Sequence, residues 1–259
     1  MKSLVDLCQR KEKISMVTCY DYLSANIISD TDIDLVLVGD SAAMVIYGHK
    51  TTLPATVEMM EAHVCAVSRG LTGKPLIADM PFLAHRKGFD LTMDAVGRLM
   101  KSGGNAVKIE GAGDSIKTIE HIVKSGVPVM GHLGMTPQSV NQLGGWKVQG
   151  KKEQGADKMV SDAKALENAG VFSIVLEMVP SKLAKTITKN INIPTIGIGA
   201  GPHTSGQVLV YHDVLGLNPG FRPKFLRTYL NGYEIIKNAL NHYSSEVKNG
   251  SFPSKNESF

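Results

Sequence analysis

Short apolar segments alternate with longer, partly polar segments along most of the chain. Eight of the short segments are rich in β-branched residues, and their apolar residues form continuous runs rather than alternating with polar ones; they lie at 15–20, 34–40, 75–82, 105–111, 128–134, 172–180, 194–201 and 207–216. Continuous apolar runs of this kind are typical of strands that are buried on both faces, as in parallel sheets. The pattern therefore predicts eight parallel strands.

The segments between these runs carry apolar residues at helical spacing. They predict helices at 56–69, 91–101, 115–125 and 157–169, several of which end in a glycine such as Gly70 or Gly170. Strands that alternate with helices predict an α/β fold, a (β/α)8 TIM barrel forming a single domain over residues 1–259. A doubly wound sheet is the alternative, because eight runs alone do not require closure.

Two long connections follow the second and fifth predicted strands, at 41–54 and 134–151. Connections of this length in a compact domain usually have a function, and their apolar residues favour lids over disordered loops. The polar tail from about residue 244 is expected to be solvated and flexible.

Composition and charge narrow the class of protein. No apolar run reaches the roughly 18 residues of a membrane helix, and the first 13 residues contain no apolar core of a secretory signal. We therefore expect a cytoplasmic protein that does not contact membranes. The net charge of +4 is scattered, and the basic clusters at 9–13 and 147–152 lack interleaved aromatic residues. This distribution argues against nucleic-acid binding.

The three cysteines are odd in number and have no CxxC spacing, which indicates reduced thiols. They are Cys8, Cys19 and Cys65. Cys19 lies within a predicted strand and is most simply a small buried apolar residue.

Ionisable side chains occur near the carboxyl ends of five consecutive predicted strands. They are Asp40, Asp79, Lys108 with Glu110, His132 and Glu177. Each one alone has a structural explanation, such as a helix cap, an ion pair or a hydrogen-bonded core histidine. In parallel α/β folds, however, these strand ends meet at the rim where ligands bind. Because buried charges require compensation, the recurrence favours a shared site.

The residue types at this rim suggest a chemistry. The carboxylates of Asp40, Asp79 and Glu110 would repel one another unless a divalent cation lay between them, and oxygen ligands favour Mg²⁺. Lys108 supplies a positive charge for a substrate carboxylate or oxyanion. Glu177 lies outside the acidic triplet and is the candidate general base. A metal, a lysine and a separate glutamate suit proton abstraction next to a carbonyl group.

Seven segments match, in order, the motifs of a known family. They are VGDS (38–41), GHKTTLP (48–54), IADMPF (77–82), AVKIEG (106–111), VMGHLGMTPQSVNQLGGWKVQGK (129–151), LEMVP (176–180) and GIGAG (197–201). Together they resemble the ketopantoate hydroxymethyltransferases. The tail EVKNGSFP also resembles the C-terminus of that family, which weighs against a merely disordered tail. The resemblance implies a (β/α)8 barrel.

The resemblance further implies an enzyme of pantothenate biosynthesis. It would transfer a hydroxymethyl group from 5,10-methylenetetrahydrofolate to 3-methyl-2-oxobutanoate, through an enolate bound to Mg²⁺, and release 2-dehydropantoate. Mg²⁺ would be ligated by Asp40 and Asp79, with Glu110 in the same metal site. The keto acid would be bound at the metal ligands and by Ser41, Lys108 and His132. Glu177 would be the base, and the protein would be a homo-oligomer, commonly a decamer.

Two positions depart from the pattern of that family. Ala42-Ala43 replaces a usual Leu-Gly pair, which implies a tolerant backbone angle or a shifted loop. Ser205 replaces a frequent aspartate, and we expect this change near the active rim to affect folate affinity.

Two alternative functions follow from the same residues. A lyase or mutase of the isocitrate lyase or phosphoenolpyruvate mutase kind would also use Mg²⁺ at barrel strand ends, but it would carry a KKCGH-like cysteine loop that this chain lacks. A non-catalytic barrel that binds a keto acid or a folate is the second alternative.

Overall fold

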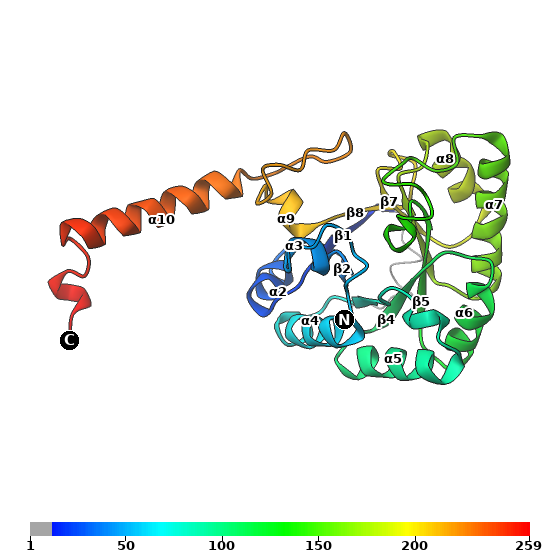
Figure 1. Cartoon of the computed structure of the whole chain (residues 1–259), viewed down its shortest axis with the longest axis horizontal. Helices are drawn as coiled ribbons and strands as arrows, with labels where there is room; N and C mark the ends of the chain where they lie inside the picture. Colours follow the sequence, from blue (N-terminus) through cyan, green and yellow to red (C-terminus); the bar gives the residue numbers. More distant parts are fainter. Residues whose placement is uncertain (1–11) are drawn as a thin grey trace. The chain divides into compact units, whose positions relative to one another are not determined.

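The computed structural model describes residues 12–259, so Cys8 and most of the basic cluster at 9–13 lie outside the described residues. Eight parallel strands pair in chain order, and β1 pairs with β8 to close a barrel (Figure 1). The strands are β1 (Ile14–Thr18), β2 (Leu35–Val38), β3 (Leu76–Asp79), β4 (Ala106–Glu110), β5 (Val129–Gly134), β6 (Ser173–Glu177), β7 (Thr195–Ile198) and β8 (Gly206–Leu209). The predicted (β/α)8 barrel is confirmed, and the open doubly wound sheet is excluded.

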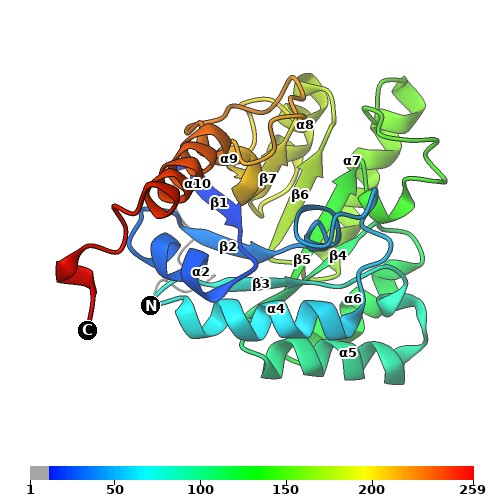
Figure 2. The same ribbon diagram turned by 60° about the vertical axis from the view of Figure 1, so that its left-hand side comes forward.

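Helices surround the barrel on its outer side (Figure 2). They are α2 (Tyr22–Ser29), α3 (Ala42–Val45), α4 (Val57–Gly70), α5 (Phe89–Lys101), α6 (Ser115–Lys124), α7 (Glu153–Asn168) and α8 (Ser181–Asn190), with 3-10 turns η1 (Ala84–Arg86) and η2 (Pro137–Ser139). The four predicted helices correspond to α4 to α7. The sequence analysis did not predict α2. Its apolar residues Leu23 and Ile27 are exposed, so apolar side chains lie on more than one face of this helix and the helical spacing of buried residues is not evident from the sequence. The sequence analysis also missed α3 and η2, which lie within the two long connections.

The interior of the barrel explains why polar residues gather at one end. Apolar side chains from all eight strands form its core, among them Ile77, Met130 and Val175. Successive side chains of a strand point to opposite faces, so the residue two positions further on also faces inward. The pairs of core residue and following polar residue are Ile77 and Asp79, Ala106 and Lys108, Met130 and His132, and Val175 and Glu177. The strand period therefore directs these four polar side chains into the carboxyl end of the barrel.

The chain from Tyr211 to Phe259 forms a second compact unit. It contains α9 (Tyr211–Val214), α10 (Gly232–Asn249) and the 3-10 turn η3 (Lys255–Glu257). The predicted strand at 207–216 is therefore wrong beyond Leu209. The expected flexible tail from about 244 is also wrong at its start, because α10 continues to Asn249 and ends at Gly250, whose φ is 75°.

Two further expectations are tested by the described residues. No helix within residues 12–259 combines the length and the apolar character needed to cross a membrane. Cys19 is fully buried next to β1, and both Cys19 and Cys65 are free thiols. The predicted burial of Cys19 is thus confirmed, although the residue lies just after β1 rather than within it.

Candidate active site

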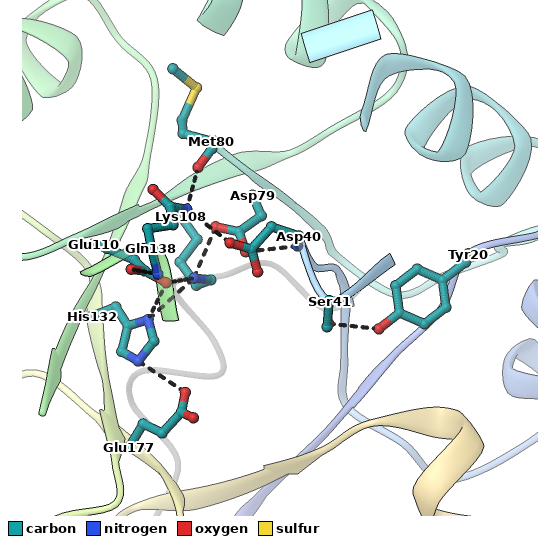
Figure 3. Close-up of polar contacts among 10 residues, drawn as sticks. All are labelled: Tyr20, Asp40, Ser41, Asp79, Met80, Lys108, Glu110, His132, Gln138 and Glu177. Carbon is teal, nitrogen blue, oxygen red and sulfur yellow. Dashed lines mark hydrogen bonds and ion pairs between the residues drawn. The ribbon is translucent and has the colours of Figure 1, made fainter. Parts of the chain in front are cut away.

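Lys108 lies among carboxylates at the carboxyl end of the barrel (Figure 3). Its Nζ is 2.8 Å from Asp79 Oδ1 and 3.8 Å from Glu110 Oε1. The strand register explains these contacts, because Asp79 of β3 is the Cα partner of Lys108 on β4. All three side chains are buried, so each charge relies on its neighbours rather than on water.

His132 connects this cluster to Glu177. Its Nδ1 is 3.3 Å from Lys108 Nζ and 3.4 Å from Glu110 Oε1. Its Nε2 is 3.3 Å from Glu177 Oε2, an electrostatic contact rather than a well-directed hydrogen bond. Glu177 is only partly buried, whereas His132 is fully enclosed. A continuous polar path thus runs from Asp79 through Lys108 and His132 to Glu177.

Asp40 and Ser41 enter from the turn after β2. The backbone N–H of Asp40 donates to Asp79 Oδ2 over 3.0 Å, which holds the two aspartates together. The Ser41 hydroxyl shares a 2.8 Å hydrogen bond with the Tyr20 hydroxyl. Ser41 therefore lies beside the carboxylate cluster with its side chain oriented by Tyr20, a residue that the sequence analysis did not identify (Figure 3).

Gln138 is the second residue that charge patterns missed. Its backbone N–H donates to Glu110 Oε2 over 3.0 Å. Its side-chain Nε2 donates to Asp40 Oδ2 over 3.0 Å and to the Met80 carbonyl over 2.9 Å. One buried residue in the connection after β5 therefore links two of the predicted metal-site carboxylates, Asp40 through its side-chain amide and Glu110 through its backbone N–H. An uncharged residue gives no signal in a search for ionisable groups, although it lies within the motif at 129–151.

Burial and neighbouring carboxylates disfavour the charged forms of Asp40 and Asp79. Burial raises the pKa of Asp40 well above its usual range, and the charges of Asp79 and Glu110 raise it further. Burial also raises the pKa of Asp79, although Lys108 opposes the shift. Burial acts in the same direction on Glu110, but contacts with His132 and Lys108 outweigh it and lower the pKa of Glu110. The cluster therefore gains from additional positive charge next to Asp40 and Asp79.

The basic side chains respond in the opposite direction. Burial alone would lower the pKa of Lys108, but Asp79 and Glu110 raise it above its usual value. For His132, burial and the Lys108 charge oppose protonation, whereas contacts with Glu110 and Glu177 raise its pKa to about 9. The neighbouring carboxylates therefore favour the charged form of both groups.

The fit of Mg²⁺ to these residues follows from the donor atoms. Within residues 12–259 no three His, Cys, Asp or Glu side chains are arranged as a ready-made metal site. Mg²⁺, however, is commonly held by one or two carboxylates, with water and substrate oxygens completing the octahedron. Asp40 and Asp79 are adjacent oxygen donors with a deficit of positive charge, and the buried Glu110 Oε1 accepts no hydrogen bond from the described residues. The donor chemistry of these residues therefore fits Mg²⁺, because Asp40 and Asp79 offer carboxylate oxygens whose charged forms need a nearby cation.

The two departures from the family pattern have different outcomes. Ala43 is buried within the helical turn α3 and is not among the described residues with positive φ, so its backbone tolerates alanine. The expectation for Ser205 is wrong. Its Oγ accepts from the Thr195 N–H over 3.2 Å, at the amino ends of β7 and β8. Ser205 therefore lies at the end of the barrel opposite to the polar cluster.

Solved structures with this fold resemble the chain at low sequence identity. A phosphoenolpyruvate phosphomutase from Streptomyces platensis subsp. rosaceus matches with a TM-score of 0.65 and 14% identity over 95% of this chain and 87% of its own. A 2,3-dimethylmalate lyase of the PEP mutase/isocitrate lyase superfamily matches with a TM-score of 0.62 and 16% identity, covering 97% and 88%. At such identities the likeness supports the barrel fold alone.

Curated relatives are much more similar in sequence. Proteins named 3-methyl-2-oxobutanoate hydroxymethyltransferase from Bdellovibrio bacteriovorus and Coxiella burnetii are 56% and 59% identical over 262 and 243 residues. The first match covers 100% of both chains, and the second covers 93% of this chain and 91% of the relative. The sequence pattern of the family described as ketopantoate hydroxymethyltransferase matches residues 1–255. The chain is an enzyme, a transferase, and it belongs to the ketopantoate hydroxymethyltransferase family.

Proposed function

We propose that this enzyme transfers a hydroxymethyl group from 5,10-methylenetetrahydrofolate to 3-methyl-2-oxobutanoate, giving 2-dehydropantoate for pantothenate biosynthesis. The names of relatives that are 54–59% identical support the acceptor and the transferred group. The observation that carries the chemistry is the 3.3 Å contact between Glu177 and His132, beside the buried group of Asp40, Asp79 and Lys108.

Asp40 and Asp79 would hold Mg²⁺, and Glu110 would belong to the same metal site. When bound there, Mg²⁺ withdraws electron density from the keto oxygen and so acidifies the hydrogen on C3 of the keto acid. Lys108 remains charged among its carboxylates and would bind the carboxylate of the substrate. The Ser41 hydroxyl, oriented by Tyr20, would donate a further hydrogen bond to that carboxylate.

Glu177 would remove the proton from C3. It is the partly exposed member of the cluster, so its carboxylate is accessible from the barrel mouth. His132 is a positioning residue in this scheme, because its Nε2 faces Glu177 Oε2 and fixes the carboxylate against the enclosed part of the cluster. Water adds to the one-carbon unit of the folate and both of its C–N bonds break, so that tetrahydrofolate leaves and the carbon remains as formaldehyde. The deprotonated C3 then attacks that carbon to form the new C–C bond, and the former carbonyl oxygen takes up a proton to become the hydroxyl group. The connections at 41–54 and 134–151 would exclude bulk water from this step.

The oligomeric state is a further part of the proposal. Apolar side chains recur every three to four residues along α10 and are exposed in the single chain; they are Tyr233, Ile236, Leu240, Tyr243 and Val247. A helix face of this kind favours packing against another chain, which supports a homo-oligomer, in the form of the expected decamer. Sedimentation velocity measures this directly. The cytoplasmic location stays a prediction.

Deuterium exchange tests the proposed chemistry. With Mg²⁺ and without folate, the wild-type protein is expected to exchange the C3 hydrogen of 3-methyl-2-oxobutanoate with solvent. Glu177→Gln is expected to bind the keto acid yet lose exchange by about 10²- to 10⁴-fold, the usual contribution of a general base. Glu153→Gln, an exposed change on α7, is the matched control.

The outcomes separate the alternatives. Wild-type binding of the keto acid without exchange would favour the non-catalytic barrel. Normal exchange in Glu177→Gln would remove Glu177 from the role of base.

A further inference from the structure

A pocket lies between the segments that follow β3 and β4, next to the polar cluster but separate from it. Its volume is about 380 Å³, and its lining includes His85 and Arg86 of η1, Phe89 of α5, and Asp114, Ser115 and Lys117 at the start of α6. Both segments leave the carboxyl ends of their strands, so the pocket is at the active end of the barrel. A volume of this size suits part of a small molecule.

His85 indicates that the pocket is built to receive a polar ligand. The side chain is 4% exposed, and neither ring nitrogen has a hydrogen-bond partner among the described residues. Burial lowers the pKa of His85 to about 4, so the neutral ring offers one N–H donor and one acceptor nitrogen. An unpartnered buried polar group is costly and calls for a reason, which a bound ligand supplies.

The charged lining favours an anion. In the described part of the chain, neither Arg86 nor Lys117 forms an ion pair, and Arg86 Nη2 donates only to Ser115 Oγ over 3.2 Å. Asp114 is the single acidic residue of the lining, so one positive charge remains in excess. The first turn of α6 adds the positive end of a helix dipole. The planar guanidinium of Arg86 is suited to a carboxylate with two oxygens.

The position of the pocket and its aromatic wall specify the ligand further. A Cβ atom added at Gly111 would lie 3.9 Å from Arg86 Nη2, so Arg86 lies close to Gly111. Gly111 directly follows Glu110 of the polar cluster. Phe89 stacks on His121 at 4.7 Å between ring centroids and is half exposed at the pocket. A ligand that extends from the cluster into this pocket would place an aromatic part beside Phe89 and an anionic part beside Arg86.

We propose that this pocket binds the aminobenzoyl-glutamate end of the folate donor, with Arg86 and Lys117 recognising its glutamate carboxylates and His85 hydrogen-bonding to the same end. The inference rests on the proposed function, because it assigns a place to the second substrate of that reaction. It makes Arg86 and Lys117 determinants of specificity for the glutamate rather than of the chemistry at C3.

The test compares two donors that differ only in the glutamate. We expect kcat/KM for 5,10-methylenetetrahydrofolate to exceed that for 5,10-methylenetetrahydropteroate by about tenfold or more in the wild type, as charge-assisted hydrogen bonds suggest. The double variant Arg86→Gln/Lys117→Gln should reduce this preference to near one, and Arg86→Gln alone should give an intermediate value. Lys87→Gln is the matched control, because Lys87 is an exposed neighbour that does not line the pocket.

A wild-type preference near one, or a preference retained in the double variant, would overturn the inference. The C3 exchange assay without folate distinguishes this from failure of the proposed function. Wild-type exchange without glutamate preference overturns the pocket alone, whereas absence of exchange overturns the proposed function and this inference with it. Both substituted side chains are exposed, and a thermal unfolding curve verifies that the variants are folded.

Discussion

Gln138 offers the sharpest test of how the site is assembled, because one buried amide connects three segments of the barrel mouth. Gln138→Ala removes the 3.0 Å bond to Asp40 Oδ2 and the 2.9 Å bond to the Met80 carbonyl. The backbone bond from residue 138 to Glu110 does not depend on the side chain. The perturbation is thus confined to two hydrogen bonds and the space that the amide occupied.

The magnitude follows from the partners. A hydrogen bond to a charged group contributes about 1.5–3 kcal/mol, and one between neutral groups contributes about 0.5–1.5 kcal/mol. Both bonds are buried, so no water replaces them directly. The free energy of unfolding is therefore expected to fall by about 2–4 kcal/mol. Because Gln138 also holds a proposed ligand, the affinity for Mg²⁺ should fall by about 10- to 100-fold.

Urea unfolding without metal measures the first effect, and calorimetric titration with Mg²⁺ measures the second. Gln149→Ala is the matched control, because Gln149 donates to the Lys147 carbonyl over 2.9 Å in a solvent-exposed hydrogen bond. It should change stability by less than about 0.5 kcal/mol. Gln138→Ala with the stability and Mg²⁺ affinity of the control would refute the assigned role.

Three other perturbations address separate parts of the structure. Gly134→Ala would place a Cβ 2.1 Å from the Glu177 carbonyl oxygen, at a residue whose φ is 98°. We expect the free energy of unfolding to fall by at least about 2 kcal/mol and C3 exchange to be lost. The control Gly145→Ala, at a φ of 101° but with nothing near the added Cβ, should keep exchange. Tyr20→Phe removes the 2.8 Å hydrogen bond to the Ser41 hydroxyl and should raise KM for the keto acid about 2- to 12-fold in steady-state assays. An unchanged KM would contradict the role given to the Ser41 hydroxyl. The pKa of His85, about 4 because of burial, lies below the unfolded value of about 6.5, so the unfolded state binds more protons between these values. Stability attributable to His85 should be present above pH 6.5 and decrease by up to about 3 kcal/mol as the pH falls through 4; His85→Gln with the same pH dependence of urea unfolding as the wild type would contradict this.

The strands and most of the charged cluster were predictable because both depend on local pattern. Apolar runs that are buried on both faces carry a signal within a few residues, and a side chain two positions after an inward-facing residue must also face inward. This period places Asp79, Lys108, His132 and Glu177 at one end without knowledge of any contact. The helix α8 was missed because it has only ten residues, of which Leu183, Ala184 and Ile187 are buried, so its apolar face is short.

The error at Ser205 has a related cause. The sequence shows that Ser205 follows the seventh strand, but not how far the chain travels before the eighth begins. In the structure the connection returns to the amino ends of the strands, where Ser205 contacts Thr195. A residue in a loop has no strand period to fix its position, so its place depends on the path of the whole connection.

The sequence by itself determined the barrel class, the inward direction of the strand-end charges and, through its motifs, the resemblance to one enzyme family. Only the tertiary structure decided which of these groups contact one another. It brings His132 next to Glu177, forms the hydrogen bond from the Gln138 amide to Asp40, which is 98 positions away in the sequence, and builds the pocket beside Arg86. The physical reason is that strand periodicity is a property of neighbouring residues, whereas a hydrogen bond between distant segments exists only after the barrel closes. Uncharged groups such as Gln138 acquire their significance from that closure alone.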